Sequence, residues 1–530
     1  KHIYHSFVDL YSRYGQPAAE QASWSPFPNP ERNRKGAFGW NDAIHADYAA
    51  SYHFNYDESA ANQLIKAGIG AVVTHRKDGI IRGTGALVAL DDNENFALLQ
   101  SNTSAHYSFE KGSSKQDYPS SLMGSIALLR QTYFDAEWYK EQGIKQERNL
   151  SLESFLQLQK FPSIFETDDK WNALRADKIG DEMNVQYIFK GSGNEYQRIQ
   201  EIAATKGSFI IPVNFPGPYD LIDPLLARQV PLEELKHWDW APANASTLKQ
   251  AGVPFAFTAD GLEDKSAFLS NIRKAAQYGL DESDVIRALC KNPAQWINVY
   301  DQLGSLDKGK WANFIITNEP LLSKKCKIEE NWVMGKKHEV NVTKENPWLG
   351  SYTLQTADKK EIKIVVENKP QGIIATWIQG ADTLSQNNTV KTDDSRITVS
   401  LTPKKDTLGI GQQYLSLQKL NSSVTGWLLI TQNGDRKNIT ISGSFTPKLK
   451  EEADTTSEAI EEWINPLTEM TYPFGAYGRT NLPAQETIWI KNGTLWTNEK
   501  EGIIKGDLLI QNGKIAQVGK VVVPSGLKVS

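Results

Sequence analysis

The sequence predicts a mixed α/β fold over about the first 310 residues, followed by antiparallel β structure. In the first part, short apolar runs alternate with stretches of helical spacing. One such run, 69–74, follows a helix-like stretch that ends at Gly68, and glycine is common just after a helix. Strands that alternate with helices predict a parallel sheet with helices outside it, either doubly wound or closed as a barrel.

The elements of this first part are expected in a regular order. The expected strands are 69–74, 186–189, 208–213 and 254–258, and the expected helices are 58–67, 194–206, 232–235, 245–251, 265–278 and 282–289. The segment 16–42 is rich in turn residues and aromatic side chains, so we expect an ordered surface loop there.

The pattern changes after about residue 303, where short strands and turns replace the alternation. Strand-length runs then follow one another through 346–448, which predicts an antiparallel β module. The segment 449–484 is acidic and then rich in Pro, Gly and Tyr, so a linker or strap is expected. In the tail 485–530, Asn492-Gly493 and Asn512-Gly513 each separate two apolar runs, which is a strong hairpin signal.

Composition excludes several classes of protein. The 530 residues are 40% hydrophobic and 23% charged with a formal net charge of −5, which argues against a disordered chain and against a nucleic-acid binder. Apolar runs stay below the ~18 residues that a membrane-spanning helix needs. The 2 cysteines exclude a disulfide framework and a cysteine-rich zinc site. The chain begins at Lys1 without an initiator methionine, so we expect a processed or truncated chain.

The segment 252–313 carries the most specific motifs. It contains Thr258-Ala259-Asp260-Gly261, then Asn292-Pro293-Ala294, then the turn Leu303-Gly304-Ser305-Leu306. This combination resembles the closing third of the amidohydrolase superfamily, in its imidazolonepropionase-like branch. The resemblance implies a (β/α)8-like barrel with a small β-sandwich. The tail 487–518 is similar to the opening sandwich strands of the same family.

The resemblance therefore implies an unusual domain order. Residues 1–310 would be a degenerate amidohydrolase-like barrel, and 311–345 would be the closing strands of a small β-sandwich. The β module 346–448 and the linker 449–484 would follow. The segment 485–530 would then open a second amidohydrolase-like repeat, as in tandem proteins of Bacteroidetes-type bacteria.

The metal ligands that the family uses are replaced in this chain. The first family signature, P-G-F-x-D-x-H-x-H, aligns with His5–Arg13, so that Tyr11 and Arg13 stand where the two histidines would be. A guanidinium stays protonated and cannot ligate zinc. On two later strands the nearest frames give Lys190 and Asn214 instead of histidine. The resemblance thus implies no metal in this chain, with zinc or another divalent metal expected in the second repeat.

Four residues remain as site candidates. Asp260 matches the strand-eight aspartate of the family, which binds metal or acts as a general base in active relatives. Without histidine partners, we expect it at the barrel mouth in an ion pair with Lys190 or Arg13. Lys190, Asn214 and His75 are candidate binding residues, and His75 could equally be a polar loop histidine without a ligand.

Three hypotheses for function remain open. In the first, the chain is part of a protein that hydrolyses C–N bonds of small-molecule or peptide-like amides, and this barrel is a non-catalytic pseudo-domain beside a second repeat or another chain. In the second, this barrel works through Asp260 and Lys190. In the third, the protein is a periplasmic or surface-associated binding scaffold without catalysis. We expect a location in the periplasm or cell envelope.

Overall fold

The structure is a computed structural model, and its description covers most of the chain. The described residues are 1–19, 28–91, 97–219, 224–341, 347–369, 372–379, 382–387, 390–393, 395–401, 413–420, 423–432, 435–447, 463–475 and 485–522. Most of the predicted linker 449–484, including its acidic part, lies outside them. The chain divides into two compact units, residues 1–340 with 462–530, and residues 341–461.

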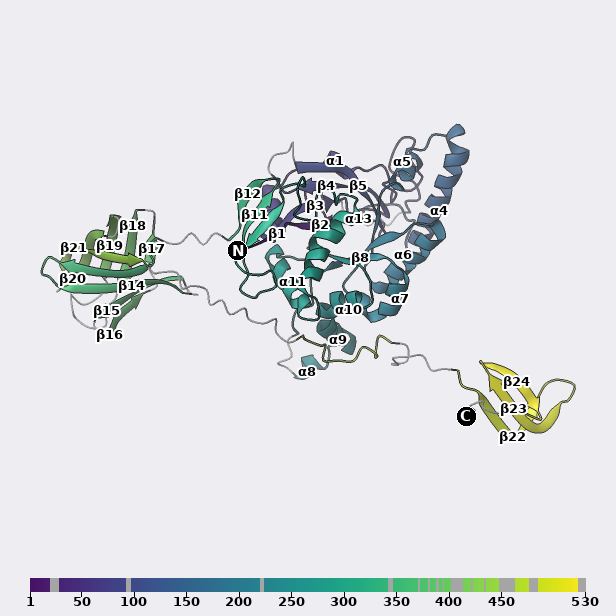
Figure 1. Ribbon diagram of the computed structural model, residues 1–530. Coiled ribbons are helices and arrows are strands. Elements are labelled where there is room, and N and C mark those ends of the chain that lie inside the picture. Colours follow the sequence, from purple (N-terminus) through teal and green to yellow (C-terminus); the bar gives the residue numbers. More distant parts are fainter. Residues whose placement is uncertain are drawn as a thin grey trace. The chain divides into compact units, whose positions relative to one another are not determined.

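An eight-stranded, nearly barrel-shaped sheet forms the centre of the first unit, which confirms the mixed α/β prediction (Figure 1). Its strands lie in chain order: β2 (Phe7–Ser12), β3 (Ile69–Thr74), β4 (Ile81–Ala89), β5 (Leu98–Ser108), β6 (Ser163–Glu166), β7 (Tyr187–Lys190), β8 (Ser208–Pro212) and β9 (Phe255–Thr258). The predicted strand 69–74 has the bounds of β3, whereas β2, β4, β5 and β6 have no counterpart among the predicted strands.

Regular alternation of strand and helix is wrong for the part of the sheet around β4. This strand is antiparallel to both β3 and β5, whereas the pairs β2–β3 and β5–β6 through β8–β9 are parallel. Only residues 75–80 connect β3 to β4, which is too short for the crossover that a parallel pair needs. Since β4 is antiparallel to both of its neighbours, β3 and β5 run in the same direction.

Side-chain hydrogen bonds join the first and last strands of the sheet. The hydroxyl of Thr258 donates to the carbonyl oxygen of Tyr11 over 3.2 Å, and the amide of Ala259 donates to Oδ2 of Asp9 over 2.9 Å. No strand ladder links β2 to β9 among the residues that the structure describes. Asp9 and Thr258 thus take the place of a ladder and bring the two edges together.

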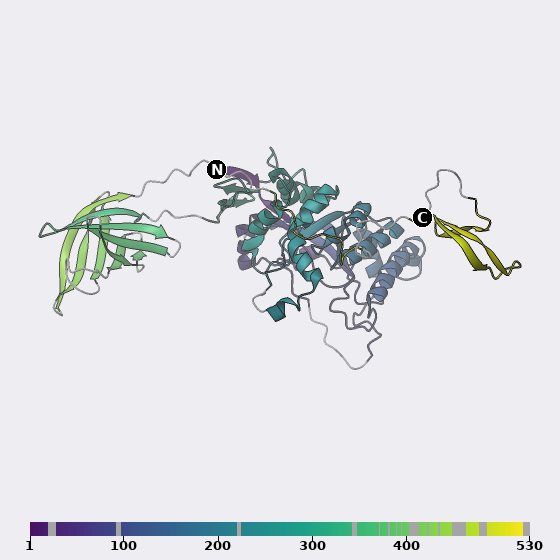
Figure 2. The same ribbon diagram turned by 90° about the horizontal axis from the view of Figure 1, so that it is seen from below.

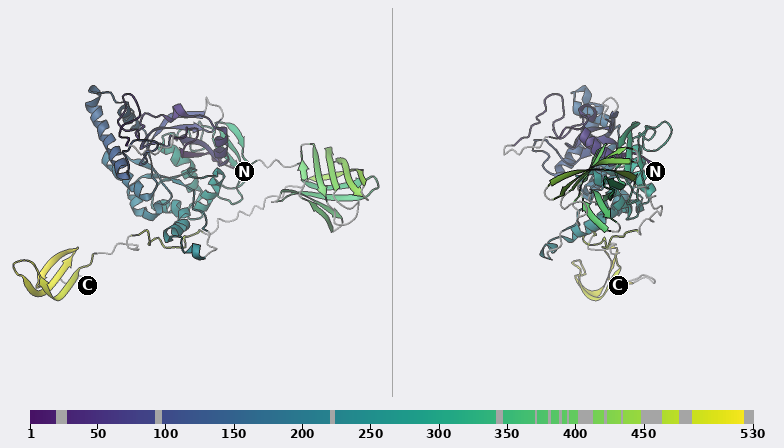
Figure 3. Two further views of the ribbon diagram at one scale, coloured as in Figure 1. Left: turned by 180° about the vertical axis from the view of Figure 1, so that it is seen from behind. Right: turned by 90° about the vertical axis from the view of Figure 1, so that its left-hand side faces the viewer.

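Helices cover the outside of this sheet, as Figure 1 and the rear view in Figure 3 show. They are α1 (Ala50–His53), α2 (Glu58–Lys66), α4 (Leu122–Glu141), α5 (Leu150–Leu158), α6 (Lys170–Met183), α7 (Ile199–Ala204), α8 (Pro224–Ala227), α9 (Leu232–Trp240), α10 (Asn244–Gln250), α11 (Phe268–Ala276), α12 (Glu282–Ile286) and α13 (Asn292–Trp296). None of the helices in the described ranges is both long and apolar enough to cross a membrane.

A four-stranded sheet packs at the amino end of β2. Its order is β1 (His2–His5), β10 (Phe314–Thr317), β11 (Ile328–Val333) and β12 (Lys336–Glu339), all antiparallel. The side chain of Asn331 fixes this sheet to the barrel by donating to the carbonyl oxygens of Ile65 and Ile69 over 3.0 and 2.9 Å. The prediction of strands within 304–345 is therefore confirmed, and their partner strand is β1.

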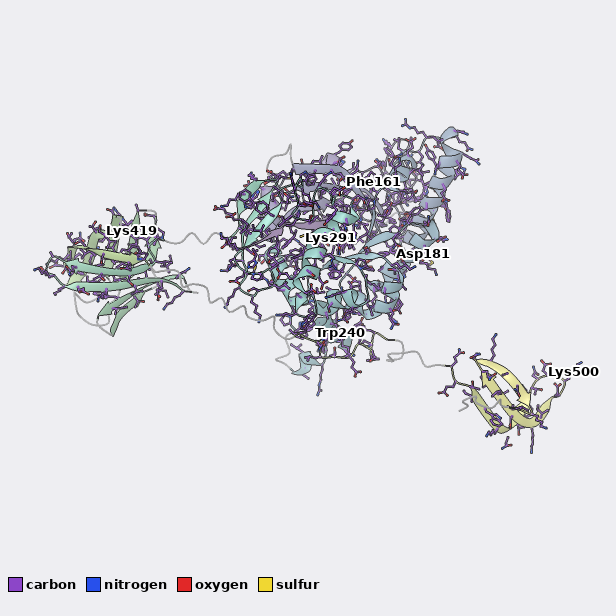
Figure 4. The ribbon with its side chains drawn as sticks, viewed as in Figure 1. Phe161, Asp181, Trp240, Lys291, Lys419 and Lys500 are labelled. Carbon is purple, nitrogen blue, oxygen red and sulfur yellow. The ribbon has the colours of Figure 1, made fainter. Side chains whose placement is uncertain are left out.

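Residues 463–475, which we call the strap, lie against the helices of the barrel. The indole of Trp240, labelled in Figure 4, donates to the carbonyl oxygen of Thr468 over 2.9 Å. Asp239 accepts from the amides of Leu467 and Thr468 over 3.2 and 2.9 Å. Phe474 is buried against the ring of Tyr196. The described part of the predicted linker is therefore an ordered element of the first unit.

The second unit is one antiparallel sheet, which curls on itself in Figure 2. Its order is β16 (Asp382–Asn387), β15 (Gly372–Gln379), β14 (Glu361–Lys369), β13 (Gly350–Thr356), β21 (Asp435–Pro447), β20 (Ser423–Gln432), β19 (Gln413–Leu420), β18 (Arg396–Leu401) and β17 (Val390–Thr392). The first and last strands are neighbours in the middle of the sheet, where Gly350 pairs with Pro447. Antiparallel β structure was predicted for this region.

The described tail forms a separate three-stranded sheet of β22 (Ile488–Trp496), β23 (Ile503–Gln511) and β24 (Lys514–Gly519). Both Asn-Gly pairs lie in this sheet. Asn512 and Gly513 have positive φ angles of 49° and 71° and form the turn between β23 and β24. Asn492 and Gly493 do not form a turn but lie within β22, at a shift in its register with β23. One of the two predicted hairpin turns is thus correct.

Candidate functional site

The carboxyl ends of the parallel strands converge at one end of the barrel, which we call the mouth. Barrels of this architecture carry their catalytic residues at that end. Here the side chains at or just after the strand ends are Tyr11, His106, Glu166, Lys190 and Asp260. Tyr11, His106 and Lys190 are buried. A mixture of aromatic, acidic and basic groups therefore lies where a metal centre would be expected.

A buried ion-pair cluster occupies one side of the mouth. Arg82, which is only 2% exposed, donates from Nη1 to Oε2 of Glu166 over 2.6 Å and to the hydroxyl of Tyr11 over 3.1 Å. Its Nε donates to the carbonyl oxygen of Gly79 over 3.0 Å. Lys77 approaches the other oxygen of Glu166 at 2.5 Å. Each oxygen of this carboxylate is therefore held by a cation.

These cations determine the charge state of Glu166. Burial would raise the pKa of this carboxyl, but the charges of Arg82 and Lys77 outweigh burial and lower the pKa to about 2. A carboxylate with so low a pKa is a weak base near neutral pH. Glu166 is thus suited to holding Arg82 in place and is poorly suited to abstracting a proton.

The second ion pair of the mouth joins Asp260 and Lys190. Oδ2 of Asp260 lies 3.2 Å from Nζ of Lys190, and Lys190 also lies over the ring of Tyr11, 5.2 Å from its centre. The amide of Asp260 donates to the hydroxyl of Thr258 over 3.0 Å. The predicted location of Asp260 at the mouth and its pairing with Lys190 are confirmed, whereas the other expected partner, Arg13, is exposed.

Asp9 is a third acidic group, buried beneath the mouth. It accepts hydrogen bonds from the amides of Tyr11 and Ala259 over 3.0 and 2.9 Å. Burial raises its pKa to about 6, although these hydrogen bonds act in the opposite direction. Since both of its oxygens accept from backbone amides of β2 and the segment after β9, Asp9 has a structural role in closing the barrel.

Two stacked histidines line the interior beside Tyr11. The rings of His75 and His106 are nearly parallel, at 5°, with centres 4.0 Å apart, and Tyr11 lies 4.3 Å from His75. Burial, the other imidazole and Arg82 lower the pKa of His75, and burial with Arg82 lowers that of His106 to about 3. Both rings are therefore neutral near pH 7. His75 lies in the connection from β3 to β4, and its side chain is fully buried.

Asn214 lies apart from the ion pairs. It is exposed and follows β8, and its amide faces Gly261, where an added Cβ would lie 2.7 Å from Nδ2 of Asn214. The structure thus places Asn214 next to the turn that follows Asp260. It joins Lys190 and Asp260 at the mouth, whereas His75 lies in the buried interior with His106.

The side chains at the mouth do not fit a divalent metal. The carboxylates of Glu166 and Asp260 are paired with Arg82, Lys77 and Lys190, and these cations would repel a metal ion placed among them. Within the described ranges, no group of three or more His, Cys, Asp or Glu side chains is arranged to hold a metal. No chemical step through a metal can therefore be derived for this barrel.

Sequence reasoning missed three residues of this site, namely Arg82, Glu166 and His106. Arg82 and Glu166 each follow a short apolar run, Ile80-Ile81 and Ile164-Phe165. Glu166 is the last residue of β6 and Arg82 is the second residue of β4, and no strand was predicted over either run. Their pairing depends on the antiparallel strand β4, which no local pattern specifies.

Comparison with protein families gives one match, between residues 240–380 and the amidohydrolase family. The resemblance to the amidohydrolase superfamily is confirmed. The matched part of the chain contains Asp260 and the motifs at 292–294 and 303–306. It does not contain Tyr11, Glu166 or Lys190. Comparison with curated proteins gives no match.

Several solved structures are distantly similar to this chain. An amidohydrolase from Thermotoga maritima MSB8 is 19% identical with a TM-score of 0.49, covering 63% of this chain and 86% of that one. A Xaa-Pro dipeptidase with bound methionine is 14% identical with a TM-score of 0.32, covering 64% and 86%. An adenosine deaminase from Xanthomonas campestris with bound zinc is 13% identical with a TM-score of 0.28, covering 56% and 72%.

Proposed function

We propose that the barrel of residues 1–340 is a non-catalytic unit of an amidohydrolase-family protein. The family acts on C–N bonds of small amide-type substrates by metal-dependent hydrolysis. The observation that carries the proposal is the state of the two mouth carboxylates. Glu166 is held by Arg82 and Lys77, and Asp260 by Lys190, so neither is free to ligate a metal or to act as a base.

Hydrolysis would then belong to a second unit. The sheet β22–β24 resembles the opening strands of this family, and we propose that it begins a second amidohydrolase-like repeat that carries the zinc or other divalent metal. A P-G-x-x-D-x-H-x-H motif within about 20 residues after Ser530 is the expected finding, since metal-binding histidines need to follow the opening strands. A continuation without histidines would contradict this arrangement.

Metal analysis tests the assignment of the barrel. The purified chain 1–530 is incubated with zinc, dialysed, and analysed for metal by mass spectrometry. We expect far less than one zinc ion per chain, and the variant Asp260→Asn should give the same result. One or more tightly bound zinc ions, lost in Asp260→Asn, would overturn the proposal and favour a working site built on Asp260 and Lys190.

A further inference from the structure

The strap, residues 463–475, is held by a group of side chains that we call the docking face. The docking face consists of Lys236, Asp239 and Trp240 from α9, together with Tyr196. Lys236 and Trp240 are four residues apart, so they lie on one side of the helix, and Asp239 lies beside them. None of these residues belongs to the ion pairs of the mouth, so the docking face is a separate feature of the barrel.

The docking face binds the main chain of the strap at consecutive residues. Asp239 accepts from the amide of Thr468 over 2.9 Å and from the amide before it over 3.2 Å. The indole of Trp240 donates to the carbonyl oxygen of Thr468 over 2.9 Å, and the ammonium of Lys236 donates to that of Glu469 over 2.5 Å. The strap contains no helix or strand, so its main chain depends on partners of this kind. Proteins that recognise extended peptides bind them through main-chain hydrogen bonds too.

Aromatic side chains anchor the two ends of the strap. Phe474 is 6% exposed, and its ring meets that of Tyr196 edge-on, with centres 6.3 Å apart. Trp463 lies against Gly279, where an added Cβ would be 2.8 Å from the indole ring, and the amide after Trp463 donates to the carbonyl oxygen of Gln277 over 2.8 Å. Buried aromatic anchors carry much of the binding energy at protein interfaces. The strap is thus fixed at both ends as well as at its centre.

Most of the hydrogen bonds at the centre involve a charged group. Asp239 accepts from the hydroxyl of Thr468 over 2.7 Å in addition to the two amides, and Lys236 donates as an ammonium. Charge-assisted hydrogen bonds are about twice as strong as neutral ones. Lys236 is only 7% exposed, so its bond to the strap is shielded from water and strengthened by the low local dielectric. These contacts have the strength and the specificity of a binding site.

We propose that the docking face is a peptide-binding site of the barrel and that the strap is its ligand. The site takes an extended peptide with a hydroxyl at the position of Thr468 and an aromatic ring at that of Phe474. Its contacts hold the strap even when the chain is cut beside it. If the tail opens a second repeat, the same contacts attach that repeat to the barrel, and this consequence alone rests on the proposed function.

Cleavage of the full chain tests the proposal. A recognition sequence for a site-specific protease is inserted between residues 455 and 456, so that cleavage gives the pieces 1–455 and 456–530. We expect the two pieces to elute together in size-exclusion chromatography at about 10 μM protein, because the strap stays on the docking face. Separate elution of the piece 456–530 would overturn the proposal.

Two variants of α9 show whether the docking face is what holds the pieces together. Asp239→Asn keeps the size of the side chain but turns an amide NH2 toward the donors of the strap, whereas Glu233→Gln neutralises an exposed carboxylate of the same helix. We expect the dissociation constant of the two pieces to rise roughly tenfold or more in Asp239→Asn and to stay unchanged in Glu233→Gln. Unchanged association in Asp239→Asn would contradict the site.

Competition with synthetic peptides uses the unsubstituted protein, so it does not depend on the folding of a variant. A peptide of residues 463–475 should displace the piece 456–530 from the cleaved protein. With Phe474→Ala the peptide should compete roughly tenfold or more weakly, whereas with Tyr472→Ala, which removes a ring that is 61% exposed, it should compete as before. Equal competition by the two substituted peptides, or none by the original peptide, would refute the site.

Because these experiments are read without zinc and without hydrolysis, their outcome is independent of the metal analysis. Separation of the cleaved pieces would leave the assignment of a non-catalytic barrel in place. A zinc-binding barrel would overturn that assignment and leave the peptide site in place.

Discussion

The two ends of the barrel differ in how they relate to the amidohydrolase pattern. At the amino end, the family motifs are present and hold the structure together. Asn292 donates to the carbonyl oxygen of Phe255, the first residue of β9, over 2.7 Å. The amide of Gly304 donates to Nε2 of His5 over 2.9 Å. At the carboxyl end, the resemblance implies histidines at the positions of Tyr11 and Lys190, and the chain has neither there.

This difference separates the residues that maintain the amino end of the barrel from those that line its mouth. Ala294 and Leu303 belong to the apolar cluster inside the barrel, so the motif segment completes the core at the amino end. Any barrel of this type needs those contacts, whether or not it is an enzyme. At the mouth, Glu166 is paired with Arg82 and Lys77, and Asp260 is paired with Lys190.

Acidification is expected to have the largest effect on the stability of the protein, and buried histidines at both ends of the barrel contribute to it. Burial lowers the pKa of His5 and His45 to about 4 and of His106 to about 3, and it lowers that of His75. The unfolded chain takes up these protons below about pH 6.5. The free energy of unfolding should therefore fall from pH 6.5 to 4, each histidine contributing up to about 1.4 kcal/mol per pH unit. Asp9 opposes this trend between about pH 6 and 4, since its pKa is raised to about 6.

Urea unfolding at pH 7 and pH 5 measures this loss. His5→Gln at the amino end and His106→Asn at the mouth should each make stability less dependent on pH, whereas His2→Asn, at an exposed position, should not. Equal stability at the two pH values would mean that the imidazoles are not buried in neutral form. Glu166 acts in a lower range, because its contribution is lost as pH falls from about 4.5 toward 2.

Removal of Glu166 tests the mouth alone. Glu166→Gln leaves the buried charge of Arg82 without its partner and should lower the free energy of unfolding by about 3–5 kcal/mol. The double variant Arg82→Met, Glu166→Leu removes both charges and should recover most of that loss. Denaturant unfolding of the three proteins provides the measurement. A loss below about 1 kcal/mol in Glu166→Gln would show that the ion pair is not buried as described.

A pair of glycines tests the packing at the amino end. Gly304 has a φ of +94°, and an added Cβ would lie 2.6 Å from Cβ of Ala294 and 2.8 Å from the carbonyl oxygen of Cys290. Gly309 has a φ of +92° with nothing within 4 Å. Alanine at both positions introduces the same backbone strain, so Gly304→Ala should cost about 2 kcal/mol more than Gly309→Ala because of crowding alone. Equal losses would show that the motif glycine is needed only for its backbone conformation.

The smallest effect is expected for Asn292. Asn292→Ala removes the hydrogen bond to the carbonyl oxygen of Phe255 and should lower the free energy of unfolding by about 1 kcal/mol. Asn318→Ala, at an exposed hydrogen-bonded turn, is the matched control and should cost less. An unchanged free energy of unfolding in Asn292→Ala would contradict a structural role for this motif.

Much of the parallel part of the fold could be predicted from local patterns. The strand β3 and the strand that ends before Asp260 are apolar runs bounded by turn residues, so their presence could be predicted without information from distant residues. The pairing of Asp260 with Lys190 could be anticipated because both residues end parallel strands and a buried carboxylate needs a cation. Arg82 and Glu166 could not be paired in advance. Arg82 lies near the start of β4, and only the reversal of that strand brings it to the mouth.

Burial was the other property that local patterns failed to show. His75 precedes Arg76-Lys77-Asp78, a charged run that is typical of an exposed loop. Its ring is nevertheless fully buried, because it turns inward onto His106 from β5. Such a stack depends on two strands that are separated by β4 in the sheet order, so it follows from tertiary packing.

The second unit begins and ends at adjacent strands, with Gly350 paired to Pro447. In genetic terms, a segment whose two ends meet can be gained or lost in a single recombination event. The nine-stranded sheet can therefore be exchanged as one cassette, and its sequence is free to diverge at a different pace from that of the barrel.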